Sequence, residues 1–403
     1  MKSVFSNSEI LVFRNETEGC AYVAHFNNAG ASLMPAKVTK AIVDHIKLEN
    51  TIGGYEAADL QASNINGFYH SAAKLLNCRT ENIAFTANAT DSFSRAISSI
   101  VFAPGDVIVT TIEDFISNQI TYLALKKRFG IKLVRTESLS TGGVDLGSME
   151  KCIIKYKPKL VAVTHIPTNS GLVQPVREIG MMCKEHDTLY LIDACQSAGQ
   201  FPLDVNQLQC DFLSITCRKF LRGPRGAGFL FVSDRILDEM YEPLFIDMRG
   251  ADWVSENEYI PKKDARRFED WEFAYALVLG AKESIDYYLQ INAVKIERQI
   301  QYLSSYIKTE LQKIDGVTIH DKGSILSSST TFHLKGSSPD LIKTFLLQRK
   351  INVVSSPRNY ALIDHGVKNV DWVMRVSPHY FNTIDEADLL IYWVKELSKK
   401  INI

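Results

Sequence analysis

The sequence predicts an α/β fold: a large domain built on a mostly parallel sheet, followed by a smaller α+β domain. Between about residue 80 and residue 235, short β-branched apolar runs alternate with helix-length segments, which is typical of βαβ units. After residue 268 the pattern changes to a long helical stretch and then to mixed strands and helices. The 403 residues are enough for two such domains.

The large domain is expected to contain seven strands covered by helices on both faces. The strands are predicted at residues 83–86, 107–110, 132–135, 160–164, 189–192, 212–216 and 228–232. Helical patterns occupy residues 117–129 and 176–186 between them, and residues 35–50 and 57–76 before them. Ser32 and Pro35 are suitable residues for the start of the first of these helices.

The smaller domain is expected to begin with one long helical stretch, because residues 271–314 contain no strong helix breaker. Further strands are predicted at residues 318–320, 329–334 and 352–354, and helices at residues 339–350 and 384–400. We therefore divide the chain into an N-terminal segment (1–20) that packs on the small domain, a large domain (21–268), and a connecting helix with the small domain (269–403).

Composition limits the classes of function. With 45 basic and 46 acidic side chains the net charge is −1, which gives no overall basic surface for nucleic acid or anionic membranes. The seven cysteines form no CxxC pair and have no zinc-binding spacing, so no metal site is expected. The N-terminus lacks the apolar core of a signal peptide, and no apolar run has membrane-spanning length. These features predict a soluble cytoplasmic protein.

Two predicted strands end next to residues that can do chemistry. Asp193 follows residues 189–192, and Lys219 follows residues 212–216. Taken alone, Asp193 would be an ordinary helix cap and Lys219 a surface lysine. Together they lie where open α/β sheets bind ligands, at the carboxyl ends of the strands. A lysine for the aldehyde and a carboxylate for the pyridinium nitrogen are what pyridoxal phosphate requires.

A phosphate site is predicted near Thr90, where residues 86–91 end a strand and open a helix. Thr216 and Arg218 are expected to help bind the phosphate. An ordinary Thr/Asp helix cap explains the same local sequence equally well. No GxGxxG follows any predicted strand and no GxxxxGK[ST] occurs, which argues against nicotinamide and nucleotide binding.

Three further side chains are candidates for the site. Phe115 follows a strand and can lie flat on a heterocycle, or be a core residue. Gln196 can donate to a ring hydroxylate. Arg375 lies in an apolar run and needs an anion, either a substrate carboxylate or an acid of the small domain. Possible polar lining is provided by His165, His365 and His379.

With these residues assembled, the chain resembles the class V aminotransferase branch of fold-type I pyridoxal-phosphate enzymes. That branch includes cysteine desulfurases, isopenicillin N epimerase, kynureninase and the sulfoxide lyase of ergothioneine biosynthesis. The likeness runs from residues 27–32 to residues 375–383. Its most specific parts are residues 193–196, the pair Arg218 and Lys219, and the turn at residues 223–228.

The resemblance implies a role for each candidate. Lys219 becomes the Schiff-base lysine and Asp193 the partner of the pyridinium nitrogen. Arg375 and Asn28 become substrate contacts. The remaining cofactor contacts would be Thr90, Thr216 and Arg218 to the phosphate, Phe115 stacked on the ring, and Gln196 and Asn169 to the ring hydroxyl. The resemblance also implies a homodimer with a shared active site, with the segments around Arg249 and Trp271 reaching across.

The chain departs from cysteine desulfurases in ways that bear on chemistry. Desulfurases carry a nucleophilic cysteine in the loop before the clamp arginine, but residues 355–365 contain none and no cysteine follows Cys217. Arg218 and Phe115 also stand where desulfurases commonly have histidines. These departures favour the kynureninase-, epimerase- and sulfoxide-lyase-like members. Cys217, two residues before the lysine, is interpreted as a small packing residue.

The expected function is that of a pyridoxal-phosphate enzyme acting on an amino acid, as a C–S lyase without a persulfide cysteine. Arg375 would hold the α-carboxylate while Lys219 removes the α-proton. A class V aminotransferase and an amino-acid epimerase are the alternatives within the family. A non-catalytic regulatory protein that binds the cofactor is the alternative of another class, although intact Lys219, Asp193 and Arg375 argue against it. The sequence does not reveal the substrate side chain.

Overall fold

The structure is a computed structural model that describes residues 3–401. Its large domain contains a seven-stranded sheet of order β2-β8-β7-β6-β5-β3-β4. The strands are β2 (Ile83–Thr86), β3 (Val107–Thr110), β4 (Lys132–Arg135), β5 (Leu160–Thr164), β6 (Leu189–Asp193), β7 (Phe212–Thr216) and β8 (Gly228–Val232). All neighbours are parallel except β8, which is antiparallel to β2 and β7. The predicted α/β class and mostly parallel sheet are confirmed.

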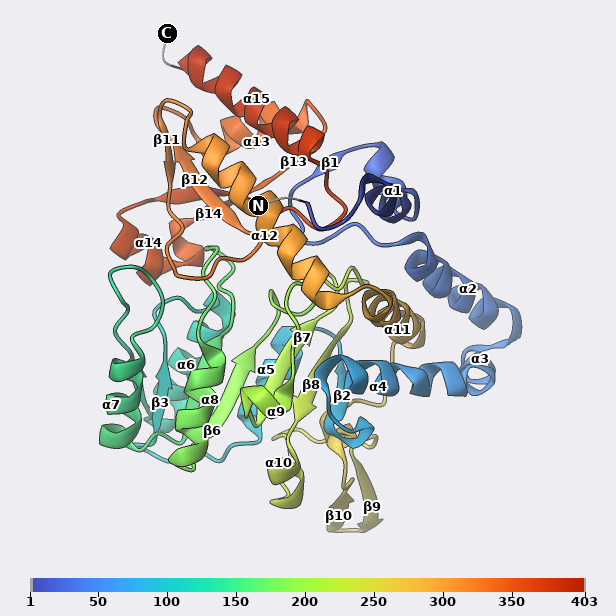
Figure 1. Cartoon of the computed structure of the whole chain (residues 1–403). Helices are drawn as coiled ribbons and strands as arrows, with labels where there is room; N and C mark the ends of the chain where they lie inside the picture. The colour runs from blue at the N-terminus through green and yellow to red at the C-terminus, as the bar shows by residue number, and fades with distance from the viewer. Residues whose placement is uncertain (1–2, 402–403) are drawn as a thin grey trace.

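Apart from the edge strand β4, the strands of this sheet are buried because both of its faces are covered. Leu160 and Ala162 of β5 pack in one apolar cluster with helix α5 (Ala89–Ser98) and the α6 helix (Ile116–Phe129). Val161 and Val163 point the other way, into a cluster that includes α7 (Leu146–Tyr156) and α8 (Val176–Glu185). Figure 1 shows α8 and α5 on opposite sides of the sheet. Successive side chains of a strand point to opposite faces of the sheet, so β5 packs against the helices on both faces.

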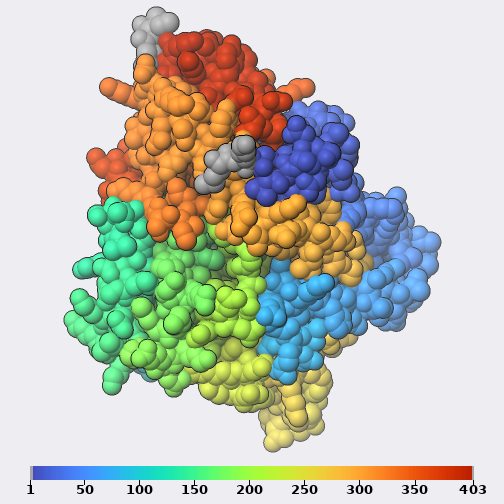
Figure 2. All heavy atoms as spheres, in the orientation of Figure 1, coloured from blue at the N-terminus to red at the C-terminus, as the bar shows by residue number. Residues whose placement is uncertain are grey.

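The small domain is built on a four-stranded antiparallel sheet of order β11-β12-β15-β14. Its elements are β11 (Val317–Ile319), β12 (Thr330–Leu334), α13 (Pro339–Leu347), β13 (Ile351–Asn352), β14 (Val354–Pro357), α14 (Leu362–Lys368), β15 (Trp372–Val376) and α15 (Ile384–Ile401). The chain's N-terminal segment lies against this domain (Figures 1 and 2). There β1 (Ala24–His25) pairs in parallel with β13, and Arg14 of α1 (Asn7–Asn15) forms a 2.8 Å ion pair with Glu386.

Two stretches predicted as single helices are each divided in two. Residues 271–314 contain α11 (Tyr275–Gln290) and α12 (Ala293–Leu311), because Ile291 is extended and Asn292 caps the second helix by accepting from the Lys295 N–H at 3.1 Å. Near the N-terminus, α2 (Ala36–Ile52) is followed by α3 (Gly54–Leu60) and α4 (Ala62–Leu76). The prediction of one continuous helix was therefore wrong for residues 271–314 and for residues 57–76.

A hairpin of β9 (Ala251–Ser255) and β10 (Glu258–Pro261) was not predicted and projects away from the sheet (Figures 1 and 2). Most of its residues are exposed. The short helices α9 (Val205–Leu208) and α10 (Asp234–Asp238) complete the large domain. Among residues 3–401, no helix combines the length and the apolar character needed to cross a bilayer.

Candidate active site

A cavity of about 330 Å³ lies at the carboxyl ends of β5, β6 and β7, beside the first turn of α5. It is the position at which open α/β sheets bind ligands. The predicted residues that line it are Thr90, Phe115, Asp193, Gln196, Thr216, Arg218 and Lys219. These residues come from four separate segments of the chain, and the fold brings them to one cavity.

Lys219 is buried in this cavity, with 6% of its surface exposed. Burial lowers the pKa of its amine to about 8. The positive charges of Arg218 and Arg375 lower this pKa further, whereas Cys195 and Asp193 raise it. Its Nζ lies 6.0 Å from the centre of the Phe115 ring. An amine with such a pKa is partly neutral near pH 7, as a nucleophile or general base must be.

Asp193 ends β6 and presents a buried carboxylate to the cavity. Its Oδ1 accepts from the Cys195 N–H at 2.9 Å, and its Oδ2 accepts from Asn118 Nδ2 at 3.2 Å. Both donors are neutral, and no basic side chain of the described chain forms an ion pair with this carboxylate. A cationic ligand atom would supply the missing charge, since unpaired buried charges are costly.

The other end of the cavity is suited to an anion. Backbone N–H groups in the first turn of α5, which Asn88 caps, have no partner within the helix. Thr90, Thr216 and Arg218 lie around this turn. Burial lowers the pKa of Arg218, with Arg225 adding to the effect. A helix N-terminus with hydroxyl groups and a guanidinium is a typical phosphate site.

A glycine brings this helix turn close to the sheet. Gly228 begins β8, and a Cβ atom there would lie 2.6 Å from the Ile215 oxygen and 2.9 Å from the carbonyl carbon of Asn88. Only a residue without a side chain allows β8 and the start of α5 to approach this closely. The anion end of the cavity therefore depends on a residue that does not itself line it.

Arg375, on β15 of the small domain, lies beside the cavity without lining it, close enough for its charge to act on Lys219. Its guanidinium donates to the Thr168 carbonyl at 2.8 Å and to Asn27 Oδ1 at 3.2 Å, while Nε has no partner among the residues that the structure describes. Burial lowers the pKa of Arg375 to about 10, and Arg218 contributes. The internal salt bridge considered from the sequence is not present within residues 3–401. The positive charge of the Arg375 guanidinium is thus not neutralised by an acid among residues 3–401.

Three predicted residues do not line the cavity: Arg375, Asn28 and Asn169. Asn28 is fully buried, with its amide bonded to the carbonyls of His25 and Ser377 and its oxygen to Ser32. The neighbouring Asn27 makes the contact with Arg375 instead.

Asn169 faces the small domain. It donates to the Tyr360 carbonyl at 3.1 Å and accepts from the Ser356 hydroxyl. Its contacts therefore tie residues 355–365 to the large domain beside Thr168, which lines the cavity.

The three histidines also lie outside the lining of this cavity. His379 has a positioning contact: its Nε2 donates to the Phe220 carbonyl at 3.0 Å, and its Nδ1 accepts from the Tyr380 N–H. Burial holds the pKa of His379 well below its ordinary value, so the imidazole is neutral. It fixes the backbone of the residue that follows Lys219.

Sequence reasoning missed Cys195 and Thr164, which line the cavity, and Asn118, which bonds to Asp193. Burial holds the Cys195 thiol protonated by raising its pKa well above the ordinary value. Asp114 lies just before the N-cap of α6 and Asn118 lies in the first turn of that helix, four residues later; this spacing was visible in the sequence. Cys217 is fully buried and does not line the cavity, in agreement with a packing role.

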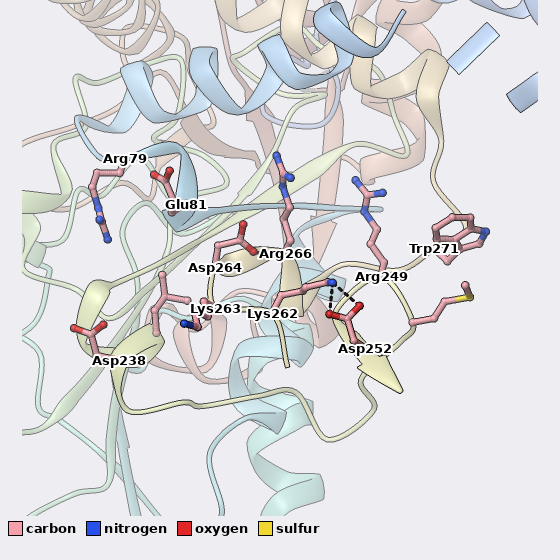
Figure 3. Close-up of a pocket in the computed structure, with 12 residues that line it drawn as sticks. Arg79, Glu81, Asp238, Arg249, Asp252, Lys262, Lys263, Asp264, Arg266 and Trp271 are labelled. Carbon is pink, nitrogen blue, oxygen red and sulfur yellow. Dashed lines mark hydrogen bonds and ion pairs between the residues drawn. The ribbon is translucent and has the colours of Figure 1, made fainter. Parts of the chain in front are cut away.

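A second, larger hollow of about 820 Å³ lies beside the hairpin, lined by Arg249, Trp271 and several exposed charged side chains (Figure 3). The Arg249 guanidinium is engaged within its own chain: it donates to Glu269 at 2.6 Å and to Tyr69 at 3.3 Å. Trp271 is 46% exposed. None of the residues around the first cavity lies here.

Comparisons with known proteins agree with this geometry. The family model described as Aminotransferase class-V matches residues 24–390. A probable cysteine desulfurase of Pyrococcus abyssi is 28% identical over 388 residues, covering 94% of this chain and 95% of the relative. One from Methanothermobacter thermautotrophicus is 27% identical over 380 residues, covering 93% and 94%.

Solved structures give the same result. The apo cysteine desulfurase of Thermococcus onnurineus NA1 superposes with a TM-score of 0.90 at 26% identity, covering 99% of this chain and 100% of the other. The cystine C–S lyase C-DES, in complex with its reaction product cysteine persulfide, superposes with a TM-score of 0.83 at 20% identity over 94% of this chain and 99% of the other. The second likeness is one of fold alone.

Proposed function

Because the chain belongs to the class V aminotransferase family of pyridoxal-phosphate enzymes, we propose that it is a C–S lyase. It would remove a sulfur substituent from Cβ of a cysteine-derived amino acid. The observation that carries this proposal is the segment of residues 355–365, which contains no cysteine and is bonded to the large domain beside the cavity. Cysteine desulfuration, the reaction for which the relatives are named, is the competing reaction.

The residues present fit the cofactor. When bound, pyridoxal phosphate withdraws electrons from the α-carbon of an amino acid. Lys219 would hold its aldehyde, Asp193 its ring nitrogen, and Phe115 one face of the ring. Gln196 was expected to donate to the ligand, but its Nε2 donates to the Ala29 carbonyl at 3.1 Å. Its Oε1 is buried without a partner among residues 3–401, an arrangement that calls for a donor on the ligand instead. Thr90, Thr216 and Arg218 at the start of α5 would hold the phosphate.

The side chains of the cavity then divide the work of elimination. Beside the cavity, Arg375 would bind the α-carboxylate through a guanidinium that forms no ion pair with an acid among residues 3–401. Lys219 accepts the α-proton, as its lowered pKa allows. The Cβ–S bond breaks with its electron pair on sulfur, which takes up a proton and leaves as a thiol or persulfide. Hydrolysis of the remaining three-carbon unit yields pyruvate and ammonia.

Desulfuration needs a protein thiol that attacks the substrate sulfur. Among the described cysteines only Cys195 lines the cavity, and its raised pKa keeps it protonated and therefore a poor nucleophile. The Ser356 and Tyr360 contacts to Asn169 hold the cysteine-free segment at the cavity. These features favour release of the sulfur with the product over its capture by the enzyme.

The products distinguish the two reactions. Protein reconstituted with pyridoxal phosphate would be given L-cystine, L-cysteine and cysteine sulfoxides, and pyruvate and alanine would be measured. Elimination gives pyruvate and ammonia, whereas desulfuration gives alanine and leaves sulfur on the protein. Lys219→Ala should abolish turnover, while Lys151→Ala, an exposed lysine of α7, should not. Alanine as the main product would refute the lyase proposal.

The hairpin supports a homodimer. Around it, Phe245 is 83% exposed and Trp253 79% exposed. Other exposed apolar side chains of this region are Leu244, Met248, Val254, Tyr259 and Ile260. Contiguous exposed apolar surface marks protein interfaces. A second copy of this chain would cover this surface and the hollow of Figure 3 beside it.

Light scattering tests this assembly. The wild type should have twice the mass of one chain, and Trp253→Glu should shift it to the monomer. Leu123→Glu, an exposed leucine on α6, serves as the matched control. A monomeric wild type would refute the dimer and leave the lyase proposal intact.

A further inference from the structure

Behind Asp193 lies a second buried carboxylate, Asp114, and one amide joins the two. Asn118 Nδ2 donates to Asp193 Oδ2 at 3.2 Å and to Asp114 Oδ1 at 3.1 Å. All three side chains are buried. The two hydrogens of a single amide nitrogen thus bridge two acids that come from different parts of the sheet edge.

Asp114 is surrounded by donors alone. Its Oδ1 accepts from the Phe115 N–H at 2.7 Å and from the Thr164 hydroxyl, and its Oδ2 accepts from Thr110 at 3.1 Å and Gln119 at 3.1 Å. No basic side chain forms an ion pair with it within residues 3–401. Asp114 itself does not line the cavity.

This arrangement fixes which end of the Asn118 amide faces Asp193. Turning the amide over would direct its oxygen at two carboxylates at once, which is unfavourable. Asp114 therefore holds the nitrogen end toward Asp193. In turn, the bond from Asn118 occupies Oδ2 and the Cys195 N–H occupies Oδ1, so the carboxylate has a defined plane.

We propose that Asp114 and Asn118 are positioning residues that orient the Asp193 carboxylate toward the ring nitrogen of the bound cofactor. The inference rests on the proposed function only through the role given to Asp193. Neither residue touches the cofactor. Their effect reaches it through one hydrogen bond to Asp193, so it should depend on the presence of the ring nitrogen.

A purely structural role for this cluster predicts something different. Asp114 immediately precedes the Phe115 N-cap of α6, and its bonds to Phe115, Asn118 and Gln119 also stabilise the first turn of that helix. Loss of such stabilisation would weaken binding of any ligand in the cavity equally. It would not distinguish a cofactor that has a ring nitrogen from one that lacks it.

The test compares two ligands of the full-length, cofactor-free protein: pyridoxal 5′-phosphate and its 1-deaza analogue, in which C–H replaces the ring nitrogen. Dissociation constants would be measured by absorbance and fluorescence for the wild type, Asn118→Ala, Asp114→Asn and Asp193→Ala. Asp321→Asn is the matched control, because Asp321 is also a buried carboxylate that accepts only neutral donors, from Gly171 and Thr331.

The wild type should prefer the natural cofactor, and Asp193→Ala should abolish that preference. Asn118→Ala and Asp114→Asn should each reduce it about tenfold, the scale of one hydrogen bond to a charged group. Asp321→Asn should leave it unchanged. If Asn118→Ala weakens both ligands equally, or neither, the inference is overturned while the proposed function stands. If the wild type binds neither ligand, the proposed site is refuted and the inference fails with it.

Discussion

Replacing Lys219 by methionine should stabilise the cofactor-free protein, by an amount that depends on pH. Burial lowers the pKa of this amine to about 8 from an ordinary value of 10.5. The difference corresponds to roughly 3 kcal/mol of unfavourable free energy in the folded state. Methionine has a similar length and carries no charge, so it does not incur this cost.

The sign of the pH dependence follows from the two protonation states. Below pH 8 the lysine is protonated in both folded and unfolded chains, and the full cost is present. Between about pH 8 and pH 10.5 the folded chain has lost the proton that the unfolded chain still binds, so wild-type stability rises with pH. The advantage of Lys219→Met should therefore shrink by roughly 3 kcal/mol across this window.

Denaturant unfolding of cofactor-free wild type and Lys219→Met, measured at several values from pH 7 to pH 10.5, provides the assay. Taking the difference between the two proteins cancels the titration of all other groups that the substitution leaves undisturbed. Lys151→Met, at an exposed lysine, should show no such pH-dependent difference. A constant difference between wild type and Lys219→Met across the range would refute a lowered pKa for this amine.

Three further outcomes are expected. Arg375→Lys should raise the KM for an amino-acid substrate about 30-fold or more while cofactor affinity, measured by absorbance, changes little, because a bidentate contact is lost. Gly228→Ala should weaken cofactor binding and lower the unfolding midpoint, since its Cβ would lie 2.9 Å from the carbonyl carbon of Asn88; a cost of about 1–3 kcal/mol is typical of such overpacking. Asn292→Ala should destabilise the protein by about 1 kcal/mol in denaturant unfolding through loss of the α12 cap, with no change in cofactor affinity.

Most strands of the large domain could be predicted because they are short, apolar and buried. Residues 160–164 illustrate this, since all five are buried in β5. The edge strand β4, with Lys132 and Arg135 at its ends, is only partly buried. The break between α11 and α12 was missed because no glycine or proline marks it. Asn292, a good N-cap residue, was the available signal. The hairpin at residues 251–261 was missed because its apolar side chains are exposed and follow no burial pattern.

The site was predictable where function follows strand ends, as for Asp193 and Lys219, which both line the cavity. Contacts between distant segments were not predictable from local patterns. Asn27 and Asn28 are adjacent in the sequence, and only the tertiary structure shows that Arg375 donates to Asn27 and not to Asn28. The link from Asp193 to Asn118 likewise exists only through space.

The pairing of β1 with β13 has a consequence for motion. The Phe26 N–H donates to the Asn352 carbonyl at 2.9 Å, and the Phe26 carbonyl accepts from the Ser377 N–H at 2.7 Å. The chain just before Asn27 is therefore hydrogen-bonded through its backbone to the small domain. If the small domain rotates relative to the large domain when a substrate binds, Asn27 moves together with Arg375 and their hydrogen bond is kept. The hydrogen bond from Arg375 to the Thr168 carbonyl of the large domain would then lengthen. Asn27 and Arg375 would therefore move together as one preassembled pair.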